Sequence, residues 1–266
     1  MAEIHPTAII APGASLARDV VIGPFCVVGE DVALGRGVVL GAHVVVGGHT
    51  TIGAGTRIFP FASIGLEPQD LKYRGEESSL IIGRGNTIRE YVTMNPGTTG
   101  GGMVSRIGDG CLFMVGAHIA HDCQIADHVI MANNATLAGH VVVGEHAFLG
   151  GLCAVHQFVR IGKHAMIGGM SGVERDVIPY GQVIGNRARL TGLNIIGMQR
   201  RGFSRDDVQC LRTAYQLLFH APGTLSDRVG ETAERFAGVK PVEDIIEFIR
   251  ADSSRAICQP AEANGG

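Results

Sequence analysis

Aliphatic residues recur at every sixth position over most of the chain between residues 4 and 173. The series is unbroken over residues 4–64, it resumes over residues 82–94, and it continues over residues 107–173. Neither the 3.6-residue period of an α-helix nor the two-residue period of a simple strand produces this spacing. A sustained period of six therefore predicts a repeat architecture.

Each six-residue unit is typical of a short strand that ends in a tight corner. Glycine often follows the aliphatic residue, and the position four after it is small or β-branched. The aliphatic side chain would point inward, while glycine would relieve the backbone where it turns. Three units per triangular turn give a parallel β-helix, in which successive coils pair at about 4.8 Å. The period alone does not set the hand of the helix.

Two segments interrupt the period, and an insertion into such a coil has to leave it as a loop. Residues 66–80 return the chain to the same phase, whereas residues 97–106, with three consecutive glycines, return it one residue out of phase. We expect both inserts to project from the prism, where a loop can reach a ligand or a neighbouring chain. The β-helical domain that carries them is expected to span residues 1–191.

The chain beyond the repeats has helical patterning, and we expect a small α-helical domain over residues 192–266. Ser204 followed by Asp207 has the spacing of a helix N-terminus, and apolar residues then recur at helical intervals. Two more amphipathic segments fit residues 224–237 and 241–251. The end of the chain, from residue 252 onward, is expected to be frayed.

Composition mainly excludes other classes of protein. The 266 residues include 39 Gly and no Trp, which suits a prism with a thin aliphatic core. A net charge of −3 provides no general attraction to nucleic acid or to an anionic membrane. The six cysteines form no CxxC pair or disulfide framework, and glycine interrupts every apolar stretch. We therefore expect a cytoplasmic protein without a signal peptide or stable membrane insertion.

Eleven histidines are candidates for chemistry, and six of them share the position three residues after the aliphatic one, which indicates an outward corner. His121 differs because it comes two residues after Ile119 and is followed by Asp122. We expect its side chain to point outward. Gly139 lies eighteen residues further on and should stack above it, with an approachable backbone N–H. An imidazole base and an N–H donor that face one groove are what acyl transfer needs.

Several motifs resemble those of the UDP-N-acetylglucosamine O-acyltransferase family. They are HIAHDC at residues 118–123, ANNATLAGH at 132–140, AVHQF at 154–158, GGMSG at 168–172 and RRGFS at 200–204. The resemblance implies a left-handed β-helix and a homotrimer with active sites between subunits. It also implies transfer of a 3-hydroxyacyl chain from acyl carrier protein to the 3-hydroxyl of UDP-N-acetylglucosamine, the first step of lipid A synthesis, without a cofactor or metal.

The same resemblance implies roles for individual residues. His121 is the expected general base, Asp122 its orienting partner, and the N–H of Gly139 the donor to the oxyanion. The other matches are substrate-binding residues: Asp70 and Lys72 in the first insert, His118, His140, His156 and Gln157 in the groove, Gly169 as the acyl-chain ruler, and Asn194, Arg200 and Arg201 at the nucleotide and phosphate. Asn95 and Ile196 stand where well-known members have His and Glu.

Other interpretations of the repeats remain open at this point. An acetyl-CoA-dependent hexapeptide enzyme, or an N-acyltransferase acting on a 3-amino sugar nucleotide, would share the fold. A γ-class carbonic anhydrase would bind zinc through histidines, for which His118 and His121 are candidates. An ice-binding or purely structural solenoid would show ranks of threonine on one face, and this sequence lacks them.

Overall fold

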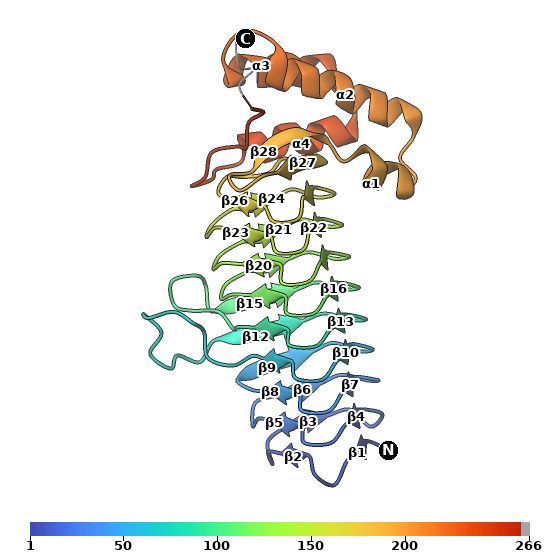
Figure 1. Cartoon of the computed structure of the whole chain (residues 1–266), viewed down its shortest axis with the longest axis vertical. Helices are drawn as coiled ribbons and strands as arrows, with labels where there is room; N and C mark the ends of the chain where they lie inside the picture. The colour runs from blue at the N-terminus through green and yellow to red at the C-terminus, as the bar shows by residue number, and fades with distance from the viewer. Residues whose placement is uncertain (262–266) are drawn as a thin grey trace.

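The computed structural model describes residues 1–261 and shows a left-handed parallel β-helix with a helical cap at its C-terminal end (Figure 1). Aliphatic residues eighteen apart pair directly across adjacent coils, as Ile22 does with Leu40 and Ile119 does with Leu137. The predicted fold class and the predicted coil length are therefore both confirmed.

Three sheets form the faces of the prism within residues 1–261. Sheet A consists of β1 (Glu3–Ile4), β4 (Val21–Ile22), β7 (Val39–Leu40), β10 (Arg57–Ile58), β13 (Thr87–Ile88), β16 (Leu112–Phe113), β19 (Ile130–Met131), β22 (Phe148–Leu149), β25 (Met166–Ile167), β27 (Gly181–Ile184) and β28 (Arg189–Leu193). Sheet B consists of β2 (Ile9–Ile10), β5 (Val27–Val28), β8 (Val45–Val46), β11 (Ser63–Ile64), β14 (Thr93–Met94), β17 (His118–Ile119), β20 (Thr136–Leu137), β23 (Ala154–Val155) and β26 (Gly172–Val173). Sheet C consists of β3 (Ser15–Leu16), β6 (Ala33–Leu34), β9 (His49–Ile52), β12 (Ser79–Ile82), β15 (Val104–Ile107), β18 (Gln124–Ile125), β21 (Val142–Val143) and β24 (Arg160–Ile161).

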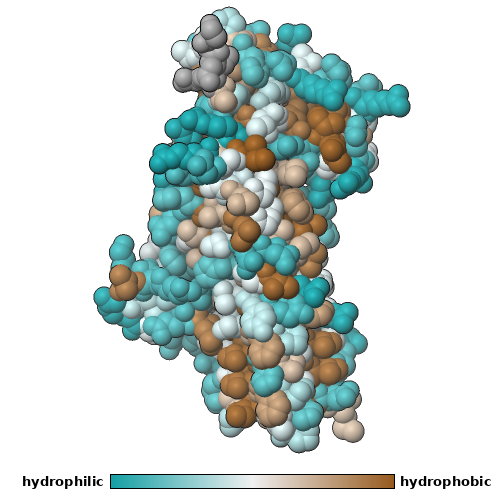
Figure 2. All heavy atoms as spheres, viewed as in Figure 1, coloured by the Kyte–Doolittle hydropathy of each residue, from teal (hydrophilic) through white to brown (hydrophobic). Residues whose placement is uncertain are grey.

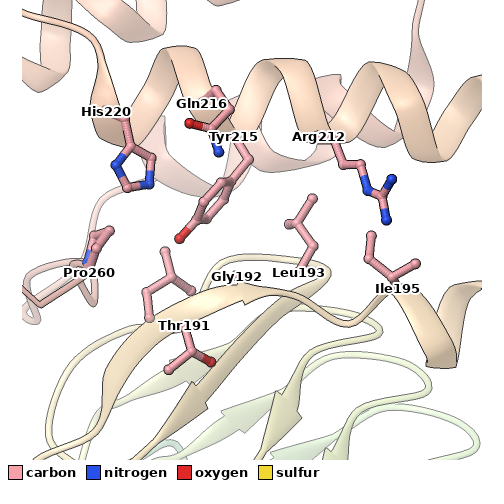
Figure 3. Close-up of a pocket in the computed structure, with 10 residues that line it drawn as sticks. Thr191, Gly192, Leu193, Ile195, Arg212, Tyr215, Gln216, His220 and Pro260 are labelled. Carbon is pink, nitrogen blue, oxygen red and sulfur yellow. The ribbon is translucent and has the colours of Figure 1, made fainter.

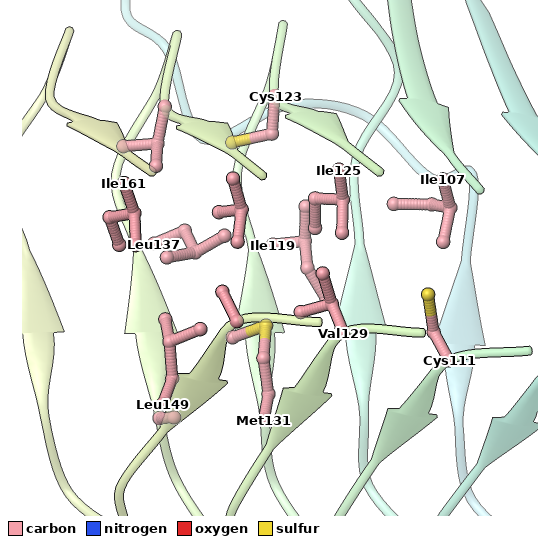
Figure 4. Packing of buried hydrophobic residues seen from close by; sticks show 14 of the residues in the cluster. Ile107, Cys111, Ile119, Cys123, Ile125, Val129, Met131, Leu137, Leu149 and Ile161 are labelled. Carbon is pink, nitrogen blue, oxygen red and sulfur yellow. The ribbon is translucent and has the colours of Figure 1, made fainter. Parts of the chain in front are cut away.

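Aliphatic side chains from the three sheets fill the axis of the prism. Ile119 and Met131 are fully buried and Ile125 is 4% exposed, and residues from neighbouring coils pack against them (Figure 4). Cys111 and Cys123 point into the same core as small side chains. Each fully buried aliphatic side chain contributes about 1.5–3 kcal/mol, so a long column of modest contacts stabilises the fold.

Adjacent sheets meet at three corners, where one residue per coil takes the left-handed backbone conformation. The B–C corner carries Asp122, His140 and Phe158; the C–A corner carries His128, His146, His164 and Tyr180; the A–B corner carries Phe25, His43, Phe61, Tyr91, Asn134, Leu152 and Met170. Five of the six histidines that share the predicted corner position have positive φ, and the sixth, His49, lies in β9 instead. The interpretation of this position as an outward corner is therefore confirmed for five of them.

Both inserts leave the prism at the B–C corner and project to one side (Figure 1). The first separates β11 from β12, and the second separates β14 from β15. Because Met94 pairs with Ile119, the second insert begins one coil below the corner of His121. Ile64 pairs with Met94, so the first insert begins one coil further down. The two inserts thus lie beside the residues that the sequence marks as reactive.

The coils end in a hairpin that the sequence did not predict. Strand β28 runs antiparallel to β27, and we propose this hairpin as the junction between the β-helical and helical domains. Four helices follow: α1 (Ile195–Arg200), α2 (Arg205–His220), α3 (Leu225–Arg235) and α4 (Lys240–Arg250). The last three correspond to the predicted helices, and Ser204 caps α2 by accepting a hydrogen bond from the N–H of Asp207. Helix α1 was missed because six residues are too few to show a helical period.

A cleft of about 430 Å³ opens between α2 and β28 (Figure 3). Leu193, Tyr215 and Arg212 are among its lining residues, and no residue predicted for the site is. Within residues 1–261, each helix is too short or too polar to span a bilayer.

The chain after α4 returns to the prism, so the expectation of a frayed end is wrong for residues 252–261. Ile257 forms a β-bridge with Asp176, and Cys258 is 1% exposed. The Asp176 carboxylate accepts hydrogen bonds from Ser253 Oγ and from Arg160 Nε, each at 2.7 Å. A buried carboxylate needs such donors, and here they tie the returning segment to the last coil. Residues 262–266 lie outside the described part of the chain.

Candidate functional site

His121 and Asp122 form a buried, hydrogen-bonded pair at the B–C corner. His121 Nδ1 lies 2.8 Å from Asp122 Oδ2, and the two side chains are 9% and 0% exposed. With the Nδ1 proton directed at the carboxylate, Nε2 keeps a lone pair that can accept a proton. The His121 side chain is nevertheless buried, because neighbouring segments cover most of it.

Gly139 lies directly against the His121 ring. A Cβ placed on Gly139 would lie 2.6 Å from His121 Nε2, so any side chain here would displace the imidazole. The N–H groups of Ala138 and His140 donate to the carbonyls of Val155 and His121, whereas the Gly139 N–H has no acceptor within residues 1–261. The structure thus brings the predicted base and the predicted N–H donor together.

Thr98 of the second insert and Ser105 of β15 hold Asp122, and the sequence analysis missed both. Thr98 donates its N–H to Asp122 Oδ1 at 2.9 Å and its hydroxyl to Oδ2 at 2.6 Å. Ser105 Oγ accepts the N–H of Asp122 at 2.7 Å. The strand register could have indicated these two residues. Met94 pairs with Ile119, so the residues that follow Met94 pass one coil below the corner of His121.

His140 stands one coil above Asp122, and the first insert comes close to it. Its Nδ1 lies 3.9 Å from Asp122 Oδ2, and its ring meets the His121 ring edge to face at 5.0 Å between centroids. Burial lowers the pKa of His140, while the charges of Asp122 and Asp70 act to raise it and that of Lys72 acts to lower it. Asp70 and Lys72 therefore lie within electrostatic reach of this corner.

His118 lies on β17, just before the B–C corner that carries Asp122, which we call the reactive corner. Its Nδ1 is 2.7 Å from Thr93 Oγ1 on the adjacent strand β14. Burial, and to a lesser extent the charge of His121, lower the pKa of His118. Its imidazole is therefore neutral near pH 7, and it can exchange hydrogen bonds with a neutral ligand without adding charge beside the base.

His156 and Gln157 extend the same corner upward, and the returning end of the chain touches both. Val155 pairs with Leu137, so this coil stacks directly on the coil of Gly139. Arg255 places Nη2 2.8 Å from His156 Nδ1 and donates Nε–H to the carbonyl of Gln157 at 3.0 Å. Arg255 was missed because its segment was expected to be frayed.

Asn194, Arg200 and Arg201 belong to the C–A corner, so a single chain does not bring them to His121. Asn194 caps α1 by accepting the N–H of Gly197, and its Nδ2 donates to the carbonyl of His164 at 2.9 Å. Arg201 Nη2 donates to the carbonyl of His146 at 3.1 Å, and Arg200 is exposed in the last turn of α1.

Gly169 lies at the A–B corner, beside Met170, whose side chain is 75% exposed. A Cβ on Gly169 would meet only the backbone of Gly151, with its oxygen at 3.3 Å, so a larger side chain would extend into open space. The predicted site residues are thus distributed over all three corners of one chain.

The reactive corner also has side chains that could bind a metal ion, since ligand atoms of His121, Asp122 and His140 lie within 4.8 Å of one another. The Asp122 oxygens, however, already accept hydrogen bonds from Thr98 and His121. The arrangement therefore fits an orienting carboxylate better than a metal ligand. His118, the other histidine suggested for zinc, bonds to Thr93 instead.

Comparisons with known proteins identify the family. Residues 176–258 match a family model described as UDP N-acetylglucosamine O-acyltransferase, domain 2, and residues 13–48 and 105–139 match the bacterial transferase hexapeptide repeat. The acyl-[acyl-carrier-protein]–UDP-N-acetylglucosamine O-acyltransferase of Caulobacter vibrioides is 53% identical over 258 residues, which cover 97% of this chain and 98% of that protein. The enzyme of the same name from Rhizobium johnstonii is 46% identical over 265 residues, covering 100% and 97%. The solved UDP-N-acetylglucosamine O-acyltransferase of Moraxella catarrhalis matches with a TM-score of 0.93 and 40% identity, covering 96% of this chain and 99% of that one. The chain therefore belongs to the acyl-[acyl-carrier-protein]–UDP-N-acetylglucosamine O-acyltransferase family.

Proposed function

We propose that this protein transfers a 3-hydroxyacyl chain from acyl carrier protein to the 3-hydroxyl of UDP-N-acetylglucosamine, the first step of lipid A synthesis. One observation carries the proposal in a chain of this family. A buried imidazole, held by a carboxylate, lies against a glycine whose N–H has no acceptor within residues 1–261. This is the combination of base and oxyanion donor that acyl transfer to a hydroxyl requires.

The reaction follows from this geometry. His121 Nε2 accepts the proton of the sugar 3-hydroxyl as its oxygen attacks the thioester carbonyl carbon. The negative charge that develops on the carbonyl oxygen is stabilised by the N–H of Gly139. The tetrahedral intermediate then collapses with cleavage of the carbon–sulfur bond, and the protonated His121 returns its proton to the departing thiolate. Asp122 stabilises the imidazolium between the two proton transfers.

We propose that the active protein is a homotrimer, in which the C–A corner of one subunit faces the B–C corner of the next. The division of the candidate residues among three corners supports this, because one chain alone cannot assemble them. Exposed apolar surface on the N-terminal coils (Figure 2) also supports it, as does the exposure of Phe25, Tyr91 and Leu152 at the A–B corner. Contiguous exposed apolar side chains of this kind commonly mark interfaces.

The charged residues fit the two substrates of this reaction. Arg200 and Arg201 provide guanidinium groups that suit a diphosphate. The exposed Arg205 extends this basic cluster to the start of α2. Since the whole chain carries a net charge of −3, an acidic carrier protein has to be attracted by a local cluster such as this one.

The decisive assay incubates the protein with UDP-N-acetylglucosamine and a panel of 3-hydroxyacyl carrier proteins and detects products by mass. We expect an ester product with one preferred chain length, and a light-scattering mass of three times the 28.0 kDa chain. Turnover only with acetyl-CoA would favour the acetyl-transfer alternative, and turnover only with a 3-amino sugar nucleotide would favour the N-acyltransferase alternative.

A further inference from the structure

We propose that Thr98 in the second insert is a positioning residue, which orients the general base through Asp122. The inference rests on the proposed function, because it concerns how His121 is held during acyl transfer. It assigns a role to the insert at residues 97–106, which the sequence shows only as an interruption of the repeat.

Thr98 fixes the rotation of the Asp122 carboxylate. Its N–H binds Oδ1 at 2.9 Å and its hydroxyl binds Oδ2 at 2.6 Å, so both carboxylate oxygens are engaged by one residue. The oxygen that accepts the Thr98 hydroxyl is also the one that lies 2.8 Å from His121 Nδ1. Thr98 is itself 3% exposed, so water does not readily replace either contact.

The insert is shaped to make these contacts. The carbonyl of Thr98 accepts the N–H groups of both Gly101 and Met103, which closes a tight turn over the carboxylate. A Cβ on Gly101 would overlap the Asp122 side chain, and Gly102 has a φ of +93°. Only glycine at Gly101 lets the turn approach this closely. The glycine run therefore serves the packing of the insert onto Asp122.

The carboxylate needs this restraint because a second imidazole competes for it. His140 Nδ1 lies 3.9 Å from the same Oδ2 atom, on the opposite side of Asp122 from the insert. If the Thr98 hydroxyl were absent, Asp122 could rotate toward His140. His121 would then lose the acceptor that keeps its proton on Nδ1 and its lone pair on Nε2. Orientation of this kind affects the chemical step rather than the binding of substrate.

Thr98→Val tests the proposal, because valine has the shape of threonine and keeps the backbone N–H. We expect kcat to fall roughly 10- to 100-fold, with KM values for both substrates nearly unchanged. Thr98→Ser restores the hydroxyl and should return kcat to within about threefold of wild type. Thr99→Val is the matched control, since Thr99 is exposed and, within residues 1–261, its hydroxyl and N–H donate hydrogen bonds only to Glu76, at 3.4 Å. Equal losses in Thr98→Val and Thr98→Ser, or a loss confined to KM, would overturn the proposal.

A double-substitution experiment tests the route through Asp122. If Thr98 acts only by orienting the carboxylate, Thr98→Val should not reduce kcat further in an Asp122→Ala background. If the double variant instead lost kcat by the product of the two single losses, Thr98 would act by a route other than Asp122.

A spectroscopic readout separates this proposal from the proposed function. In ¹⁵N-histidine-labelled protein, we expect the His121 Nδ1–H signal in wild type and in Thr98→Ser, but not in Thr98→Val. An unchanged signal in Thr98→Val would contradict the positioning role whether or not the protein transfers acyl groups. Absence of acyl transfer by wild type with the signal present would overturn only the proposed function.

Discussion

The B–C and C–A corners of the prism share a backbone but differ in chemistry. At both corners the residue three after the aliphatic position has φ near +60°, as in Asp122 at 60° and His146 at 58°. The C–A corner fills this position with stacked rings: His128 and His146 have centroids 4.8 Å apart, and His146 and His164 have centroids 5.0 Å apart. The B–C corner interrupts the stack with a carboxylate and places a histidine one residue earlier. The repeat thus supplies a generic corner, and one displaced pair of residues distinguishes the corner to which we assign the chemistry.

What covers each corner reinforces the difference. Both inserts leave the chain at the B–C corner, and the second one packs Thr98 onto Asp122. The C–A corner is instead covered by α1 and the residues after it, which bring the cation of Arg201 close to His146. Burial, followed by the charges of His146, Arg201 and Lys163, lowers the pKa of His164 to about 4. The B–C corner places the His121 imidazole against the Asp122 carboxylate. At the C–A corner, burial and nearby cations favour the neutral form of His164.

The sharpest test of this contrast is to remove one histidine from each corner. His121→Ala should lower kcat roughly 10²- to 10⁴-fold, because it removes the proposed general base. His146→Ala should leave kcat within about threefold, because Arg201 binds the His146 carbonyl rather than its ring. Steady-state kinetics and a melting curve for each variant provide the measurement. A His121→Ala enzyme that keeps more than a tenth of the wild-type rate would refute the assignment.

The third corner extends the comparison to substrate selection. Gly169→Met should shift donor preference toward shorter acyl chains by roughly 50- to 200-fold, since excluding three or four methylenes costs about 0.8 kcal/mol each. The new side chain has space, because only the backbone of Gly151 lies near the added Cβ. The measurement is a competition assay between carrier proteins of different chain length. An unchanged donor profile would place the ruler elsewhere, while rates on short donors should stay near wild type.

Two glycines at the same position of the repeat provide a finer test. Gly139 and Gly151 both come two residues after an aliphatic residue, but an added Cβ meets the His121 ring at Gly139 and only the Asn133 oxygen, at 3.4 Å, at Gly151. Gly139→Ala should lower kcat roughly 10- to 100-fold by displacing the imidazole. Gly151→Ala should leave both kcat and the melting temperature close to wild type. Similar kinetics for the two variants would mean that Gly139 does not face the reacting atoms.

The strict period explains which features could be predicted from sequence. A fixed offset of eighteen residues places Gly139 against His121, because each coil repeats the one below it. Thr98 escaped prediction because it lies on an insert whose own path has no period, and Ser105 because it lies on β15, directly after that insert. Thr98 contacts Asp122 through the turn that the insert makes, and that turn depends on tertiary packing.

The C-terminal region shows the same limit in another form. Helix α2 has several turns and a capping residue, so its periodic apolar positions made it predictable. The hairpin of β27 and β28 and the returning segment with Arg255 carry no comparable pattern, and long-range contacts to Asp176 and His156 hold that segment. The relation of Arg201 to the B–C corner would depend on the proposed homotrimer, which no local pattern in one chain encodes.

The smallest expected effect concerns stability, and it tests whether the histidine stack at the C–A corner is purely structural. The pKa of His164 is about 4 in the folded protein, against about 6.5 in an unfolded chain. Above pH 6.5 both states are neutral at this residue. As the pH falls below 6.5, His164 becomes protonated in the unfolded state but stays neutral in the folded state. The free energy of unfolding therefore falls progressively until about pH 4. The full loss amounts to about 3–4 kcal/mol.

His164→Phe should remove this acid sensitivity while keeping the ring stack. Phe158 already occupies the equivalent position at the B–C corner, with φ of 64°, and stacks on His140 at 4.4 Å between centroids. The substitution also removes a buried Nδ1 atom that has no hydrogen-bond partner within residues 1–261. We expect the variant to match or slightly exceed wild type in melting temperature at pH 7.5 and to lose less of it at pH 5, with kcat at pH 7.5 unchanged. An equal drop in melting temperature between pH 7.5 and pH 5 in both proteins would show that His164 accepts a proton in the folded state. The C–A corner would then tolerate a charged imidazole, as the B–C corner does.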